Sequence, residues 1–399
     1  MTNQARPTRD RRHHAPLRKS HCGGNRPPFE RIALVRQGGG ALGAYQGGVY
    51  QGLDEAGLYP DWIAGISIGA INAALIAGNP PDKRAERLRA FWEGITPPHA
   101  AHALWPAGGD DHLTRGLMSR LSSASVLMTG VPNFFAPRLP VPWLHPPGGE
   151  GATSFYDTAQ LKSTLERLVD FDRINHGGET RLSLGAVNVR TGNFVYFDTA
   201  THVIGPDHVM ASGALPPGFP AVEIDGEHYW DGGVVSNTPL DWVVEARPAA
   251  DSLIFQVDLW NAHGNFPRTL TEVATRQKEI QYSSRTRLIT DRFHRSQTLY
   301  NNLQSLIDKL PPELMNSPEI EFLKEHANER HYNIIHLIYR SRQYELDSKD
   351  YDFSRMSMED HWRSGYNDTV RTLRHPEVLD RHTGDRRVFI FDLGRDNRE

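Results

Sequence analysis

Cysteine is nearly absent from this 399-residue chain, in which Cys22 is the only one. A single cysteine excludes an intramolecular disulfide and any zinc site built from several cysteines. An excess of one charge is also lacking, because the formal net charge is only −4. A charge balance this close to neutral gives no overall attraction to nucleic acid or to anionic lipid. No nucleic-acid partner is therefore expected.

Long apolar segments are missing as well. The most apolar run, residues 63–78, is shorter than the roughly 20 residues of a membrane span and contains Ser67 and Asn72. The N-terminus carries Arg11 and Arg12 without the apolar segment of a signal peptide. We therefore expect a cytoplasmic protein, and a transient peripheral contact with a membrane surface stays open. Residues 1–29 are basic and poor in large apolar groups, which predicts a disordered tail.

Histidines are present, but they show no pattern of metal ligands. Five of them, late in the chain, are scattered without ligand spacing: His263, His294, His331, His336 and His361. Because zinc-binding histidines recur at short, fixed spacings, we interpret these as solvated or structural side chains. No metal and no organic cofactor is expected.

Short apolar segments of strand length alternate with helical patterns through residues 31–259. Strands are predicted at 32–35, 62–65, 181–189, 194–198, 227–230 and 253–259, and helices at 41–56, from 70 onward, 83–94, 156–169 and 206–212. This alternation predicts an α/β fold, a three-layer α/β/α sandwich around a mostly parallel central sheet.

Two further segments lie inside and after this α/β domain, predicted at residues 30–260. An irregular insertion at 96–152 is rich in proline, glycine and aromatic side chains. It is typical of a lid or a lipid-contacting loop, and simple packing over the core explains it equally well. Residues 261–399 are predicted as a largely helical C-terminal extension, with helices at 269–310, 319–328 and 358–373. Late strands at 332–340 and 388–393 could join the edge of the main sheet.

The turn after the strand at 62–65 spells GISIG, a match to the G-x-S-x-G nucleophile elbow of serine hydrolases. In such an elbow Ser67 is held on a strained turn between a strand and a helix, and its hydroxyl projects into a cleft. Gly65 and Gly69 are needed because side chains there would collide with the crossing backbones. The pentapeptide alone fits a glycine-rich turn in a packed core equally well.

A second motif, Gly38-Gly39-Gly40 with Gly43 further on, stands between the first strand and the first helix. It matches the G-x-G-x-x-G pattern of dinucleotide-binding proteins. In those proteins an acidic residue follows the second strand, whereas Asp61 precedes it here, so we reject a dinucleotide site. Free amides at a helix N-terminus also suit an oxyanion. We interpret the three glycines as donors to a developing oxyanion.

The third motif is Asp231-Gly232-Gly233, at the end of a predicted strand. A serine nucleophile needs a base, and a tight turn here could bring the Asp231 carboxylate against Ser67. No histidine offers a convincing alternative, since His382 lies far out in the tail. The amide of Ile68 is a further candidate donor to the oxyanion. Taken alone, the Asp-Gly pair also fits an ordinary turn.

GGGALG, GISIG and DGG, in this order on an α/β chain, resemble the patatin-like phospholipase family. The linking segments AVNVRTGNFVYFD and SGALPPGFPAVEIDGEHYWDGG look like that family too. The resemblance covers residues 31–260 and implies a Ser-Asp dyad, with Ser67 as nucleophile, Asp231 as general base and Gly38 to Gly40 as the oxyanion loop. The rest resembles the extra C-terminal region of some bacterial members.

One position departs from the family pattern. Members often carry Arg or Lys where this chain has Leu42, directly before Gly43. That cation would help to order the loop or its oxyanion field. Leu42 can instead pack inward and leave this work to backbone dipoles, which would lower the activity or alter the substrate preference.

These observations lead to a serine acyl hydrolase that cleaves a lipid carboxylic ester through an acyl-enzyme on Ser67. A non-catalytic protein that binds a lipid or a partner on the same scaffold is one alternative, and an acyltransferase with the same intermediate is another. The head group, the acyl length and the oligomeric state cannot be predicted from these residues.

Overall fold

The computed structural model describes residues 26–96, 112–315, 317–326, 330–341, 345, 348–382 and 387–393. Nine strands of this part form the main sheet. They are β1 (Arg31–Arg36), β2 (Trp62–Ile66), β5 (Arg181–Asn188), β6 (Phe194–Asp198), β7 (Val222–Ile224), β8 (Glu227–Asp231), β9 (Ser252–Asp258), β10 (Tyr332–Ile338) and β11 (Val388–Phe391). Two further strands, β3 (Ala136–Pro137) and β4 (Tyr156–Asp157), pair with each other.

The sheet runs in the order β11-β10-β9-β1-β2-β5-β8-β7, and β6 pairs with β5. The six strands from β11 to β5 are parallel, whereas β6 and β8 lie antiparallel to β5. In the centre, Arg36 of β1 is in register with Gly65 of β2. The turns that follow these two strands therefore leave the sheet side by side at its carboxyl edge, where sites in open α/β sheets form.

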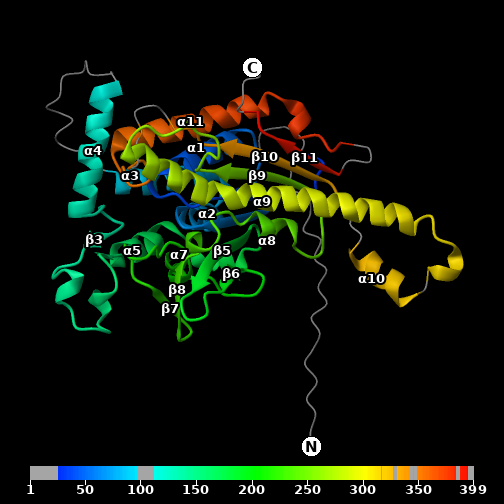
Figure 1. Cartoon of the computed structure of the whole chain (residues 1–399), viewed down its shortest axis with the longest axis horizontal. Helices are drawn as coiled ribbons and strands as arrows, with labels where there is room; N and C mark the ends of the chain where they lie inside the picture. Colours follow the sequence, from blue (N-terminus) through cyan, green and yellow to red (C-terminus); the bar gives the residue numbers. More distant parts are fainter. Residues whose placement is uncertain are drawn as a thin grey trace, which may run out of the picture.

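Helices cover both faces of this sheet (Figure 1). They are α1 (Gly43–Glu55), α2 (Ile68–Ala77), α3 (Arg84–Ile95), α4 (His112–Thr129), α5 (Ala159–Leu168), α6 (Phe171–His176), α7 (Pro206–Ser212), α8 (Leu240–Val244), α9 (Leu270–Ile307), α10 (Pro318–His326) and α11 (Arg355–Leu373).

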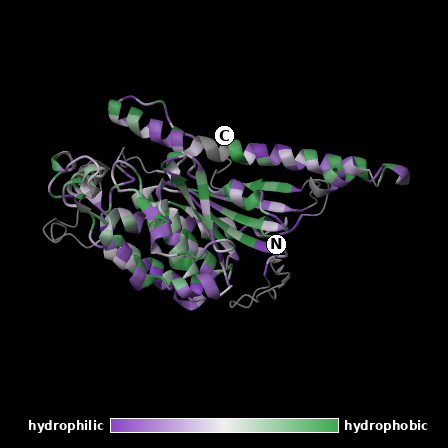
Figure 2. Cartoon of the chain, turned by 90° about the horizontal axis from the view of Figure 1, so that it is seen from below, coloured by the Kyte–Doolittle hydropathy of each residue, from purple (hydrophilic) through white to green (hydrophobic). Residues whose placement is uncertain are grey.

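Alternate side chains of β1 enter two separate apolar cores. Ile32 and Leu34 pack with α1, α2, α3 and α11, whereas Ala33 and Val35 pack with α8 and with Phe293 of α9. Because both faces are covered, the central strands are mostly apolar between their ends, and Figure 2 shows them largely green between the helical layers. The predicted three-layer α/β sandwich with a mostly parallel sheet is confirmed.

The C-terminal part of the chain completes the main sheet. β10 pairs with β9, and β11 pairs with β10, both in parallel. The helix α11 lies against α1 so closely that a Cβ on Gly48 would sit 1.8 Å from the carbonyl oxygen of Trp362. The long helix α9 runs past the body and carries α10 at its far end (Figure 1). A boundary at residue 260 stays a prediction, although the sheet itself is continuous across it.

Three sequence predictions need correction. The insertion at 96–152 is not irregular throughout, because α4 fills 112–129 within the described residues. The helix predicted from residue 156 begins at Ala159, because Tyr156–Asp157 is the strand β4. The predicted tail extends too far, since Phe29 is buried and Arg26 forms an ion pair with Asp61, while residues 1–25 lie outside the described part.

No helix in the described ranges combines the length and the apolar character that crossing a membrane requires.

Candidate active site

Ser67 lies in the turn between β2 and α2 with a φ of 58°, a left-handed backbone that only a few per cent of non-glycine residues adopt. Neighbouring backbone holds this turn. The Ser67 amide donates to the Ser212 carbonyl at 3.0 Å, and a Cβ on Gly65 would lie 2.4 Å from the Gly69 carbonyl oxygen. A Cβ on Gly69 would lie 2.6 Å from the carbonyl oxygen of Arg36. The predicted close crossing at Gly65 and Gly69 is confirmed.

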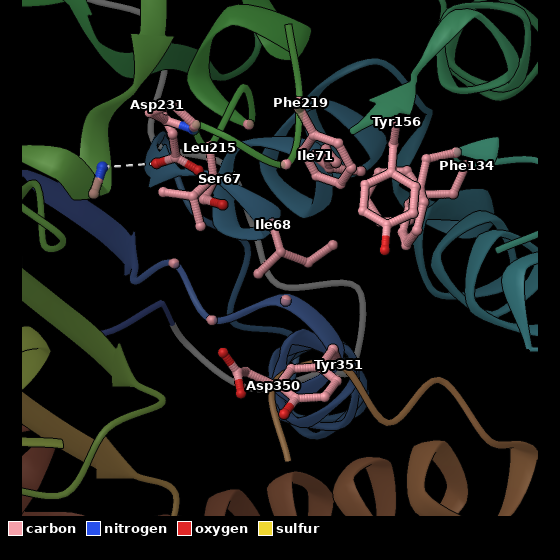
Figure 3. A pocket seen from close by; sticks show the side chains of 18 of the residues that line it. Ser67, Ile68, Ile71, Phe134, Tyr156, Leu215, Phe219, Asp231, Asp350 and Tyr351 are labelled. Carbon is pink, nitrogen blue, oxygen red and sulfur yellow. Dashed lines mark hydrogen bonds between the residues drawn. The ribbon is translucent and has the colours of Figure 1, made fainter. Parts of the chain in front are cut away.

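Asp231 ends β8, and its side chain caps the short 3-10 helix at Gly232–Val234 by accepting the Gly233 amide at 2.7 Å. The Ser67 hydroxyl also lies close enough to this carboxylate to lower its pKa. Figure 3 shows the two side chains pointing toward each other. Burial raises the pKa of Asp231 to about 7, although the Ser67 hydroxyl and the Gly233 amide oppose the shift. A carboxylate with this pKa accepts a proton far more readily than an exposed one.

The glycine loop lies directly against the serine. A Cβ on Gly38 would be 2.9 Å from the Cβ of Ser67 and 2.5 Å from Oδ1 of Asn237. The Gly38 carbonyl accepts hydrogen bonds from Asn237 Nδ2 and Trp260 Nε1, both at 2.9 Å. The Gly38 amide faces the Asn237 carbonyl at 3.4 Å. Gly39 precedes the 3-10 helix Gly40–Leu42, which continues into α1 at Gly43.

These groups share one cavity of about 330 Å³. Ser67, Asp231, Ile68 and the glycine loop form one end, and apolar side chains form most of the remaining wall. In Figure 3, Ile71, Phe134, Tyr156 and Phe219 gather on one side, while Asp350 and Tyr351 lie across the cavity from Ser67. The volume and the apolar lining suit an acyl chain more than a charged group.

A family model described as patatin-like phospholipase matches residues 34–243, more than half of the chain. The chain belongs to the patatin-like phospholipase family. A second model, described as patatin phospholipase, matches residues 280–385 in the C-terminal part. The resemblance inferred from the three motifs is confirmed.

Two solved structures are similar to this patatin-like chain. VipD from Legionella pneumophila has 14% sequence identity and a TM-score of 0.38, with 91% of this chain and 72% of that protein covered. Human GIVD cytosolic phospholipase A2 has 12% identity and a TM-score of 0.41, and this chain spans 60% of its length, with 88% of this chain covered. A search of curated proteins gives no match.

Two features of the patatin-like site answer questions that the sequence raised. Leu42 is fully buried in the core, so it packs inward as expected. No histidine of the described residues lines the cavity. His361 is buried, and its Nε2 lies 3.2 Å from the Glu345 carboxylate. It therefore packs inside the protein and does not face the cavity. Within the same described part, no three metal-ligating side chains gather as a metal site requires.

Sequence reasoning missed several residues around the site. Ser212 is the first residue of the SGALPP segment and Asn237 follows the DGG motif, so both polar residues could have been noticed. Trp260, Asp350 and Tyr351 also line the cavity. The last two come from a charged segment near residue 350 that carries no motif, and only the fold brings them to Ser67.

Proposed function

We propose that this protein is a serine acyl hydrolase that cleaves a carboxylic ester of a lipid. The observation that supports it most strongly is that the Ser67 hydroxyl faces the buried Asp231 carboxylate at the end of an apolar cavity. Family membership adds to it, because the matching model is that of patatin-like phospholipases. The dyad and the acyl-enzyme are the parts that experiment must test.

The reaction would proceed in two steps. Ser67 Oγ attacks the ester carbonyl while its proton passes to Asp231, and the tetrahedral intermediate collapses when the leaving alcohol takes up that proton. Asp231 then removes a proton from water, which attacks the acyl-enzyme, and the carboxylic acid leaves as Ser67 recovers its proton. The two steps need one base, and the raised pKa of Asp231 suits it to accept and return a proton near neutral pH.

The oxyanion of each intermediate would be stabilised by backbone amides. The Gly38 amide faces Asn237, which leaves those of Gly39 and Gly40 as the donors of the loop. Ile68 is the first residue of α2 and would add its amide. The N-termini of α2 and of the Gly40–Leu42 helix meet at this point, so both add positive potential. Removing one oxyanion donor costs roughly 3–4 kcal/mol of barrier in known enzymes.

A lipid surface is the proposed source of the substrate. Large apolar side chains stand exposed on α4 and the segment that follows it, which we call the apolar rim: Leu127, Met128, Leu139, Trp143 and Leu144. Leu127 lines the cavity itself, and Trp143 packs near Phe155, whose amide bonds to the cavity residue Pro217. The rim would place the cavity mouth on a bilayer and admit an acyl chain without passage through water.

Hydrolysis of a panel of esters and phospholipids of graded chain length tests the proposed function. The wild type should hydrolyse at least one class, and Ser67→Ala should reduce its turnover at least 10³-fold while keeping the same melting temperature within a few degrees. Equal turnover by the Ser67→Ala variant would refute the proposal. Transfer of the acyl group to an added alcohol would identify an acyltransferase instead.

A further inference from the structure

The segment of residues 348–353, here called the strap, reaches the glycine loop from the C-terminal part of the chain. The Ala41 amide donates to the carbonyl of Asp350 at 2.8 Å. Gly40 beside it has a φ of +54°, and a Cβ there would lie 2.1 Å from the same carbonyl oxygen. Glycine at position 40 therefore permits both the turn and the contact. The strap touches the loop through backbone, a contact that side-chain patterns do not reveal.

The carbonyl of Ala41, which belongs to the next peptide unit, is also held by the C-terminal part. His361 of α11 places its Nδ1 3.4 Å from the carbonyl oxygen of Ala41. Its Nε2 faces Glu345, which also accepts the Tyr339 hydroxyl at 2.6 Å. Burial alone would lower the pKa of His361, but Glu345, Asp352 and the Ala41 carbonyl together outweigh burial and raise it. A charged imidazole donates from both nitrogens, so it suits the Ala41 carbonyl.

Two crossed ion pairs fix the strap to α9. Lys278 contacts both carboxylate oxygens of Asp350 at 3.0 Å, and the next residue, Glu279, accepts Lys349 Nζ at 2.7 Å. The Lys349 side chain is only 2% exposed and also donates to the Ser341 hydroxyl at 2.6 Å. The cation precedes the anion on both segments, in Lys278-Glu279 and in Lys349-Asp350, and the two pairs cross. A shift by one residue would place like charges together, so the ion pairs set the register.

The strap is at the same time a wall of the cavity. Asp350, Tyr351 and Phe353 line it together with Ser67 and Asp231. Figure 3 shows Asp350 and Tyr351 facing Ser67 and Ile68 from the opposite side. The end of the strap is fixed as well, since Asp352 accepts the Ser357 hydroxyl at 2.7 Å and Phe353 packs on Phe134.

We propose that the C-terminal region positions the oxyanion loop, and that Lys278 is the positioning residue that sets the strap. This inference rests on the proposed function for its kinetic consequence. Lys278 does not touch the substrate; it holds Asp350, whose carbonyl holds Ala41 and thereby the amides of Gly39 and Gly40. Because these amides matter most in the transition state, loosening them should lower kcat and leave KM nearly unchanged.

Three variants test it in the full chain. Lys278→Met removes the cation, Lys278→Arg restores it, and Lys324→Met makes the same change on α10, where the Lys324 ammonium reaches only the Met315 carbonyl in the described residues. With the ester that the wild type hydrolyses best, Lys278→Met should lower kcat about tenfold or more, with KM within twofold. Lys278→Arg should recover most of the loss, and Lys324→Met should match the wild type.

Hydrogen exchange supplies a readout that needs no activity. Amide exchange in the peptide covering residues 38–42 should be at least fivefold faster in Lys278→Met than in the wild type and unchanged in Lys324→Met. If Lys278→Met does not fold, Asp350→Asn removes the same ion pair and should show the same exchange. Unchanged exchange and unchanged kcat would overturn the inference. A wild type without esterase activity but with the expected exchange would refute the proposed function alone.

Discussion

The Ser67 hydroxyl and the Asp231 carboxylate face each other although the two residues lie 164 positions apart along the chain (231 − 67). The sheet explains this contact. β2 delivers Ser67, its neighbour β5 is in register with β8 at Ala186 and Asp231, and both turns open on the same cavity. An antiparallel strand thus brings its carboxylate to the carboxyl edge of parallel strands.

The first prediction concerns pH. Asp231 has to be ionised to accept the Ser67 proton, and burial raises its pKa to about 7. We therefore expect kcat/KM to be constant above about pH 8 and to fall about tenfold per pH unit well below pH 7. A pH profile with an ester that does not itself titrate checks this. A profile that stays flat down to pH 5 would argue against Asp231 as the base.

The second prediction concerns stability. Between the unfolded pKa of 3.8 and the folded pKa of about 7, the unfolded chain releases the Asp231 proton while the folded protein keeps it. The free energy of unfolding therefore falls as pH rises through this window, and the loss is complete above pH 7.

Asp231→Asn removes that charge and keeps the shape of the side chain. We expect it to abolish hydrolysis and to raise the free energy of unfolding at pH 8 by on the order of 2–4 kcal/mol, with little change at pH 4. Urea unfolding at pH 4 and pH 8 measures the two changes in the free energy of unfolding, and an ester assay measures hydrolysis. Equal destabilisation at pH 4 and pH 8 would contradict the account of this buried carboxylate.

The third prediction concerns the glycine loop. In Gly38→Ala the new methyl group would meet Ser67 and Asn237 well inside contact distance, so the loop has to move away from the serine. We expect kcat to fall about 100-fold in a folded protein. Gly94→Ala is the matched control, because its Cβ would meet nothing closer than 3.9 Å, and it should keep full activity. Wild-type kinetics for Gly38→Ala would show that the loop takes no part.

The fourth prediction concerns the apolar rim. Leu139, Trp143 and Leu144 are 87%, 76% and 73% exposed. Insertion into a bilayer would remove the apolar surface of each side chain from water, which favours binding. Changing all three to Ser should weaken sedimentation with phosphatidylcholine vesicles at least tenfold and spare hydrolysis of a soluble short-chain ester. Leu299→Ser with Leu306→Ser, exposed side chains of α9, is the control and should bind vesicles normally. Equal binding by both variants would rule the rim out.

The sequence was most informative where local chemistry determines structure. Gly65, Ser67 and Gly69 predicted the elbow because only small residues allow β2 and α2 to cross so closely. Short continuous apolar segments between helical patterns predicted the sheet, because side chains on both of its faces are buried.

The sequence was least informative about contacts made by backbone over long distances. Asp350 reaches Ala41 through its carbonyl, which any residue could supply, so no side-chain pattern marks it. Two strands of the C-terminal part, β10 and β11, were predicted as strands, but only the fold shows that they extend the sheet beyond β9. The helix α4 was missed because proline and glycine dominate the segments around it.

The site of covalent labelling by a fluorophosphonate tests the central claim most directly, because this probe reacts only with an activated serine. Digestion and mass spectrometry should find the phosphonyl group on Ser67 in the wild type, with labelling at least 100-fold slower in Asp231→Asn and absent in Ser67→Ala. Labelling of another serine, or undiminished labelling in Asp231→Asn, would contradict the Ser67–Asp231 dyad.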